Sequence, residues 1–229
     1  MPDPRTLLLI HGAWHGAWCW EKVTPHLDDA DVAWQSLDLP LQTLAGDAAA
    51  VQSVLDAVEG PAVLVGHSYG GAVITAAGTH PAVEHLVFLA ALTPDADESC
   101  AACFPEAASP GTELGKAFHF DDQGRACLDA TGKDYLYNDC SDDDADAAFA
   151  RLRPIGMDCF DASPAAVAWR ERPTTYVVCA NDKGIHPDLQ RSLAARCGGD
   201  VVEWNLDHSP FYSDPARTAA LLVTLAEGG

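Results

Sequence analysis

Residues 62–79 read AVLVGHSYGGAVITAAGT, and this stretch decides the fold. The short apolar run Ala62–Val65 is typical of a buried strand, and the small, apolar residues from Gly71 to Thr79 are typical of a helix. A G-x-S-x-G pattern, Gly66–Gly70, occupies the turn between them. Such a sharp turn exposes its central residue, Ser68, beside a helix N-terminus whose backbone N–H groups can stabilise a negatively charged oxygen. We therefore predict that Ser68 is a nucleophile.

Five further runs rich in aliphatic or β-branched residues indicate strands: Thr6–Ile10, Val32–Leu37, His85–Ala90, Thr175–Ala180 and Val201–Leu206. Helical patterns lie between these runs, with start signals at Thr43, Pro187 and Asp214-Pro215. Short apolar strands joined through helices require crossover connections, and hence a mostly parallel sheet covered on both faces. The prediction is a doubly wound α/β core of about six strands, formed by residues 1–92 and 173–229.

Residues 93–172 break this rhythm with prolines, glycines, an acidic run at 142–146 and no strong strand signal. Because eighty structureless residues are improbable inside a compact domain, we interpret this interval as a helical lid inserted over the sheet. Some of its large apolar side chains should line a pocket over Ser68, although they could equally form the core of the lid itself. They are Phe104, Phe118, Phe120, Tyr135, Tyr137, Phe149, Met157, Phe160 and Trp169.

The composition narrows the classes of partner. The 229 residues include 13 Lys and Arg against 34 Asp and Glu, a formal charge of -21 that would repel nucleic acids and anionic membrane surfaces. No apolar stretch approaches the roughly 20 residues that span a bilayer. No signal segment precedes Thr6, so we expect a cytoplasmic protein whose eight cysteines are mostly buried thiols. Cys100 and Cys103 form a lone C-x-x-C, which favours the same interpretation over a metal or redox site.

A serine hydroxyl needs a base to take its proton, and the base needs a carboxylate to orient it. His208 follows the last predicted strand, at the sheet edge where Ser68 stands. Asp182 follows the preceding strand and gives the chain order Ser, acid, His. Asp207 is the rival acid, but its side chain should be splayed away from the adjacent imidazole of His208. The side chain of His67 should likewise point away from Ser68.

An acyl-transfer site also needs donors for the developing oxyanion. The first predicted strand runs into His11-Gly12-Ala13-Trp14-His15-Gly16-Ala17-Trp18, where small residues allow close approach to a substrate carbonyl. We expect the backbone N–H groups of Ala13 and Tyr69 to form the oxyanion hole. Gly12, Trp14, His15 and, from the lid, His119 are candidates for substrate contact, with a structural role as the alternative for His15.

These residues together resemble the α/β-hydrolase superfamily, and more narrowly its small lidded branch of plant methylesterases, hydroxynitrile lyases and bacterial esterase-like proteins. The likeness runs through the blocks His11–Trp18, Asp38–Pro40, Gly66–Gly71, Asn181–Ile185 and Asp207–Pro210. In that branch the residues at the positions of Ser68, Asp182 and His208 form the catalytic triad. Lyase members carry a threonine and a lysine where this chain has Gly12 and Ser209, so the resemblance favours ester hydrolysis.

We therefore expect a carboxylic-ester hydrolase that cleaves a small or medium neutral ester through an acyl-enzyme on Ser68, with no metal or cofactor. The expected partner is a small-molecule substrate, and lidded hydrolases of this size often form homodimers. Two alternatives stay open on the same fold. One is a non-hydrolytic enzyme of secondary metabolism, such as a cyclase, an elimination catalyst or a lyase, and the other is a ligand-binding receptor with negligible turnover.

Overall fold

The computed structural model describes residues 5–104 and 112–228 of the chain. Its centre is a six-stranded sheet in the order β2-β1-β3-β4-β7-β8, in which all neighbouring strands are parallel. The strands are β1 (Thr6–Ile10), β2 (Trp34–Ser36), β3 (Ala62–His67), β4 (Val83–Leu89), β7 (Thr174–Cys179) and β8 (Asp200–Trp204). The predicted α/β fold with about six mostly parallel strands is confirmed.

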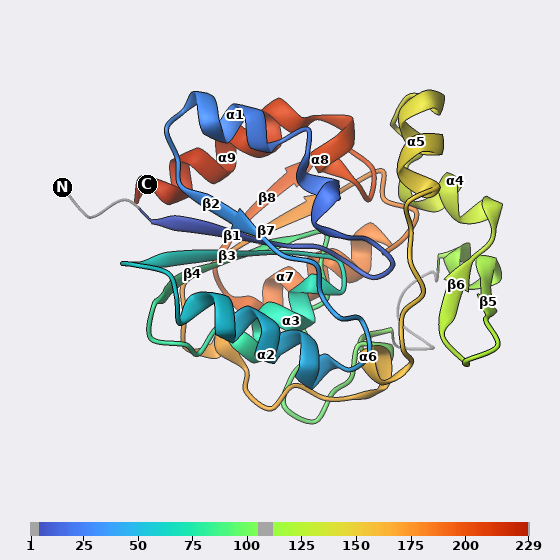
Figure 1. Cartoon of the computed structure of the whole chain (residues 1–229), viewed down its shortest axis with the longest axis horizontal. Helices are drawn as coiled ribbons and strands as arrows, with labels where there is room; N and C mark the ends of the chain where they lie inside the picture. Colours follow the sequence, from blue (N-terminus) through green and yellow to red (C-terminus); the bar gives the residue numbers. More distant parts are fainter. Residues whose placement is uncertain (1–4, 105–111, 229) are drawn as a thin grey trace.

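Helices cover both faces of this sheet, as a doubly wound fold requires. Figure 1 shows α1 (Thr24–Asp29) and α9 (Pro215–Ala226) on one face, and α2 (Leu44–Leu55), α3 (Gly70–Ala77) and α7 (Pro187–Cys197) on the other. Two shorter elements, η1 (Ala17–Trp20) and α8 (Pro210–Ser213), pack against each other beside α9. Strands β1, β3 and β7 between the two layers are almost entirely buried.

The helix boundaries follow from capping residues visible in the sequence. The Thr43 side chain accepts a hydrogen bond from the Gly46 N–H at the start of α2, and Asp214 does the same for Arg217 at the start of α9. Helix α7 ends at Gly198, which has the left-handed conformation (φ +70°) that glycine adopts without steric cost. The predicted helix starts at these positions are confirmed.

The register of the parallel strands brings their carboxyl ends to one edge of the sheet. Ile10 of β1 lies opposite Gly66 of β3, and His67 of β3 lies opposite Leu89 of β4. The loops that follow β1, β3, β7 and β8 therefore emerge together, as expected for an open α/β sheet.

Residues 93–172, the interval predicted to form a lid and named the lid segment for that reason, contain short helices and one hairpin. The helices are η2 (Ala101–Cys103), η3 (Glu113–Ala117), η4 (Ala130–Gly132), α4 (Lys133–Leu136), α5 (Asp142–Phe149), α6 (Asp158–Asp161) and η5 (Ala168–Arg170). An antiparallel pair, β5 (Phe118–Phe120) and β6 (Ala126–Leu128), was not predicted, because three-residue strands carry no readable periodicity. Figure 1 shows this hairpin with α4 and α5 beside one end of the sheet. Residues 1–4, 105–111 and 229 of the predicted intervals lie outside the described residues.

No helix in the described ranges is long and apolar enough to cross a membrane. All eight cysteines are free thiols, and Cys19, Cys100, Cys103, Cys159 and Cys179 are buried. Burial raises the pKa values of the Cys100 and Cys103 thiols above their ordinary value, since desolvation disfavours the thiolate.

Candidate active site

Ser68 stands at the turn from β3 into α3 with a backbone φ of +52°, in the left-handed region. A non-glycine residue held there costs about 1–3 kcal/mol, so the surrounding structure must impose the conformation. The Ser68 N–H donates to the carbonyl of Leu89 at 3.2 Å, and its own carbonyl accepts from Gly71 and Leu92, each at 3.0 Å. A Cβ at Gly70 would lie 2.7 Å from the Ile10 carbonyl oxygen, so the turn also needs glycine there. The predicted strained turn is present.

His208 and Asp182 are joined by a buried hydrogen bond. The Nδ1–H of His208 donates to Oδ2 of Asp182 at 2.7 Å, because a carboxylate can only accept. Both side chains are almost fully buried. The bond fixes the tautomer in which His208 Nε2 is free to act as a base. His208 and Ser68 line the same cavity.

The carboxylate of Asp182 is itself held by three further donors. Oδ1 accepts from the backbone N–H groups of Gly184 at 2.6 Å and Ile185 at 2.9 Å, and Oδ2 accepts from Nε2 of Gln190 at 2.6 Å. Gln190 is fully buried in α7, and its Oε1 accepts from the Cys179 N–H at 2.9 Å. Sequence reasoning missed Gln190. The available signal was a glutamine in the apolar stripe of its helix, where a buried polar side chain needs partners.

Asp207 faces a different set of partners from those of Asp182. Its Oδ2 accepts from the Asp139 N–H at 3.0 Å and the Cys140 thiol at 3.5 Å, and its Oδ1 accepts from the Ser209 N–H and the Ser213 hydroxyl. As expected, this carboxylate is splayed away from the neighbouring imidazole. Burial raises its pKa, while these hydrogen bonds act in the opposite direction. Asp207 thus links the loop after β8 to the lid segment.

Ala13 and Tyr69 both line the cavity that contains Ser68 and His208. Within residues 5–104 and 112–228, neither backbone N–H donates to a protein acceptor. The loop that carries Ala13 is tightly turned, with Trp14 at a φ of +62°. Gly12 packs closely against the nucleophile turn, since a Cβ on Gly12 would be 2.9 Å from the Cβ of Ser68. The geometry leaves two N–H groups available to a substrate oxygen.

His67 lies beside the base without reaching Ser68. Its Nε2–H donates to the backbone carbonyl of His208 at 2.8 Å, and the two rings are 4.7 Å apart. Complete burial holds the pKa of His67 well below its ordinary value, so the ring is neutral. His67 therefore supports the loop that carries His208.

The cavity beside Ser68 has a volume of about 430 Å³ and mostly apolar walls. Four of the predicted lid side chains line it, namely Phe104, Phe118, Met157 and Phe160, together with Trp14, Leu92, Leu114 and Ile185. The Trp14 ring packs edge-on against Phe118, with centroids 5.1 Å apart. Among the described residues of the lining, Asp161 is the one that carries a formal charge.

The remaining lid side chains that were candidates for the pocket do not line this cavity. Tyr137 and Trp169 are buried and form hydrogen bonds, whereas Phe120 is 58% exposed. The ring of Phe149 packs near Gly132 within the lid segment. Tyr135 lines a separate cavity described below.

Two histidines considered for substrate contact lie outside the cavity lining. His15 is buried, with its Nδ1–H donating to the Ala13 carbonyl at 2.7 Å and its Nε2 accepting from the Tyr137 hydroxyl at 2.7 Å. Burial lowers its pKa to about 3, so it is a neutral structural histidine, the alternative considered for it. His119 is exposed on β5 because its hairpin turns that side chain outward. Gly12 is likewise absent from the lining, while Trp14 belongs to it.

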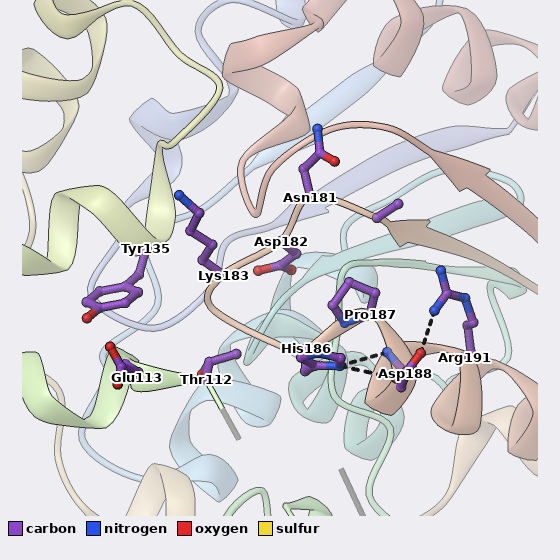
Figure 2. A pocket seen from close by; sticks show the side chains of 11 residues that line it. Thr112, Glu113, Tyr135, Asn181, Asp182, Lys183, His186, Pro187, Asp188 and Arg191 are labelled. Atoms are coloured by element: carbon purple, nitrogen blue, oxygen red, sulfur yellow. Dashed lines mark hydrogen bonds and ion pairs between the residues drawn. The ribbon is translucent and has the colours of Figure 1, made fainter. Parts of the chain in front are cut away.

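A second cavity of about 590 Å³ is lined in part by Asp182 and its neighbours Asn181 and Lys183. Figure 2 shows the loop with Asn181 and Lys183 on one side of it, and Glu113 and Tyr135 of the lid segment on the other. Thr112 belongs to both cavities, and its hydroxyl donates to the Gly184 carbonyl at 2.9 Å. Across residues 5–104 and 112–228, no three His, Cys, Asp or Glu side chains group as a metal site requires.

A family model described as "Alpha/beta hydrolase family" matches residues 7–221. The chain belongs to this family. The α/β-hydrolase is 28% identical to norfluorocurarine synthase 1 from Strychnos nux-vomica, over 97% of this chain and 96% of the synthase. It is 26% identical to methylesterase 2 from Arabidopsis thaliana, over 96% of this chain and 95% of the methylesterase.

A solved structure, a pyrethroid hydrolase from Sphingobium faniae JZ-2, superposes on the α/β-hydrolase with a TM-score of 0.85 at 23% identity, covering 98% of both chains. At that identity the superposition shows the shared fold alone. The predicted resemblance to the superfamily and to its methylesterases is confirmed. The methylesterases among the relatives support ester hydrolysis in general terms.

Proposed function

We propose that this α/β-hydrolase cleaves a small or medium neutral carboxylic ester through an acyl-enzyme on Ser68. The observation that carries the proposal is the 2.7 Å hydrogen bond between His208 and Asp182, with His208 and the strained Ser68 lining the same cavity. A nucleophile, an oriented base and available N–H donors are the parts that acyl transfer requires.

Each step of the proposed reaction has a residue to perform it. His208 Nε2 takes the Ser68 proton as the hydroxyl attacks the ester carbonyl, and Asp182 stabilises the imidazolium that forms. The N–H groups of Ala13 and Tyr69 donate to the oxyanion of the tetrahedral intermediate. His208 then protonates the leaving alcohol and activates the water that releases the acid. This sequence uses no metal or cofactor.

The cavity favours an uncharged acyl group of limited size. Its apolar walls would have to desolvate a charged acyl group without a compensating partner, which is unfavourable. Anionic substrates are disfavoured twice, by Asp161 in the lining and by the formal charge of -21 on the whole chain. We therefore propose an uncharged small molecule as the binding partner, rather than nucleic acid or a membrane.

One comparison favours a second candidate. The name of norfluorocurarine synthase 1 describes a synthase, and its sequence aligns over 97% of this chain. The second candidate is a non-hydrolytic reaction in which His208 removes a proton from a substrate without an ester and the N–H groups of Ala13 and Tyr69 stabilise an enolate. The mostly apolar cavity would bind such an uncharged substrate as well as it would bind an ester.

The test is time-resolved hydrolysis of p-nitrophenyl esters of increasing acyl length, with Ser68→Ala as the matched control. Multiple turnovers that disappear in Ser68→Ala support the serine esterase, and the acyl length at which rates fall reports the size of the pocket. A release of about one equivalent, or none, contradicts the proposal and shifts the assignment to a non-hydrolytic enzyme or a receptor. Retained turnover in Ser68→Ala would show that Ser68 is not the nucleophile.

A further inference from the structure

Asp47 is a fully buried carboxylate in α2, outside the groups used in the proposed reaction. Its Oδ1 accepts from the Leu41 N–H at 2.8 Å. Its Oδ2 accepts from the Tyr69 hydroxyl at 2.7 Å and from the Cys159 thiol at 3.6 Å. Burial raises its pKa, and among the described residues Arg153 opposes that shift through its charge without donating a hydrogen bond to the carboxylate. A buried carboxylate held by neutral donors alone is costly to the fold, so its presence calls for an explanation.

The three donors come from three different parts of the molecule. Leu41 lies in the loop after β2 with a φ of +55°, and Cys159 lies in α6 of the lid segment. Tyr69 is the residue directly after the nucleophile, and its backbone N–H is one of the two proposed oxyanion donors. One carboxylate therefore connects the core, the lid segment and the turn that carries Ser68.

Two further contacts connect the lid segment to Leu41 and Tyr69, two of the donors to Asp47. The Gly156 N–H donates to the Leu41 carbonyl at 2.8 Å. The ring of Phe160, which lines the cavity, packs against the ring of Tyr69 with centroids 6.0 Å apart. Displacement of the Tyr69 phenol would thus be transmitted both to the cavity wall and to the backbone beside Ser68.

We propose that Asp47 is a positioning residue, which anchors the Tyr69 hydroxyl and thereby fixes the Tyr69 backbone N–H against the reacting oxygen. This inference rests on the proposed acyl transfer. Tyr69 is held at both ends, by the turn at its backbone and by Asp47 at its hydroxyl, so its N–H has little freedom to rotate. A displacement of about 1 Å at a reacting group can reduce a rate by about 100-fold, which gives this anchor a catalytic consequence.

A purely structural role for Asp47 makes a different prediction. If Asp47 served only the fold, loss of the Tyr69 hydroxyl would lower thermal stability and leave kcat unchanged. If Asp47 positions Tyr69, Tyr69→Phe keeps the ring against Phe160 but releases its outer end, and kcat falls about tenfold while KM stays within twofold. Asp47→Asn leaves one acceptor oxygen for three donors, so the anchor of the Tyr69 hydroxyl is weakened and kcat should fall.

The experiment measures kcat, KM and Tm for Tyr69→Phe, Asp47→Asn and the double variant with a p-nitrophenyl ester. The same variants are labelled with a fluorophosphonate, whose reaction with Ser68 also develops charge on an oxygen in the oxyanion hole. We expect both single variants to react more slowly with both reagents. The double variant should be no slower than the slower single variant, because the two side chains act as one unit. Thr75→Val is the matched control, since it removes another buried hydroxyl bond of α3, from Thr75 to the Gly71 carbonyl at 2.8 Å.

The outcomes separate this inference from the proposed function. Unchanged kcat and labelling rates in both single variants would overturn the positioning role even if the enzyme is an esterase. Fully additive effects in the double variant would also contradict it. If the wild type is labelled at Ser68 but does not turn over esters, the proposed function fails while the labelling rates still decide the role of Asp47. If the wild type is not labelled at all, both fail.

Discussion

The carboxylate of Asp207 accepts a hydrogen bond from the backbone N–H of Asp139 at 3.0 Å, across 68 residues of sequence, and takes no part in orienting its neighbour His208. The two carboxylates near His208 therefore have different roles. Asp182 holds the imidazole, whereas Asp207 holds the lid segment to the loop after β8.

Replacing these two acids should give different kinetic results. We expect Asp182→Asn to lower kcat/KM by about 10⁴-fold, because the amide favours the wrong tautomer of His208. Asp207→Asn should cost less than 100-fold and should lower the Tm, since it weakens the contact to Asp139 and Cys140. Steady-state kinetics on one ester with both variants decides the matter. A larger loss in Asp207→Asn would mean that Asp207 is the catalytic acid.

Gln190 should affect catalysis through Asp182. In Gln190→Leu, Asp182 loses a donor at 2.6 Å and the Cys179 N–H loses its acceptor, at a cost of about 1–3 kcal/mol for each buried group left unpaired. We expect a lower Tm and a kcat reduced about tenfold, because Asp182 gains freedom to turn away from His208. Thermal unfolding and kinetics are measured beside Arg191→Gln, an exposed change on the same helix. Equal kcat values in the two variants would show that Gln190 is only structural.

Buried histidines should make the fold sensitive to mild acid. Burial lowers the pKa of His11 to about 4 and that of His15 to about 3, whereas an unfolded histidine titrates near 6.5. The unfolded chain therefore binds more protons below about pH 6.5, and stability is lost as the pH falls from there toward the folded pKa values. Each histidine contributes about 1.4 kcal/mol per pH unit in that window.

The acid sensitivity can be measured as the free energy of urea unfolding at pH 7.5, 6.5 and 5.5. Asp47 and Asp207 act in the opposite direction, because burial raises their pKa values. We expect His15→Gln to reduce the slope below pH 6.5 by about one proton. A wild-type stability that is flat between pH 7.5 and 5.5 would refute the assignment of neutral buried histidines.

Phe160 should limit the length of the acyl group. Its ring lines the cavity and packs against Trp14 at a centroid distance of 5.8 Å, so Phe160→Ala enlarges an apolar wall. We expect the preferred p-nitrophenyl ester to lengthen by about two to four carbons, at roughly 0.8 kcal/mol for each buried methylene. The control is Phe120→Ala, which removes a lid phenylalanine that is 58% exposed. An unchanged chain-length profile in Phe160→Ala would place the acyl group elsewhere.

Local sequence patterns were sufficient to predict the strands and helix caps of the α/β core. The strand at Thr6–Ile10 and the caps at Thr43 and Asp214 are set by neighbouring residues, so periodicity and capping preferences reveal them. The pairing of Asp182 with His208 followed from topology, because loops after parallel strands meet at one edge.

Contacts between distant segments could not be predicted in the same way. His15 is placed by the hydroxyl of Tyr137, 122 residues away, and no local signal links them. The partnership of Asp47 with Tyr69 also depends on how α2 lies against α3. The β5–β6 hairpin takes its place through Ile155, whose backbone pairs with Ala126. Each of these depends on tertiary packing that overrides local preference.

The wide spacing of the candidate site along the chain also has a consequence for folding during synthesis. Trp14 donates from Nε1 to the carbonyl of Ala126, 112 residues later, and His67 donates from Nε2 to the carbonyl of His208, 141 residues later. A ribosome delivers Ser68 well before His208, and the β4 edge of the sheet stays unpaired until β7 has been made. In the proposed triad, a nascent chain that stops before the loop after β8 carries Ser68 without the base that would activate it.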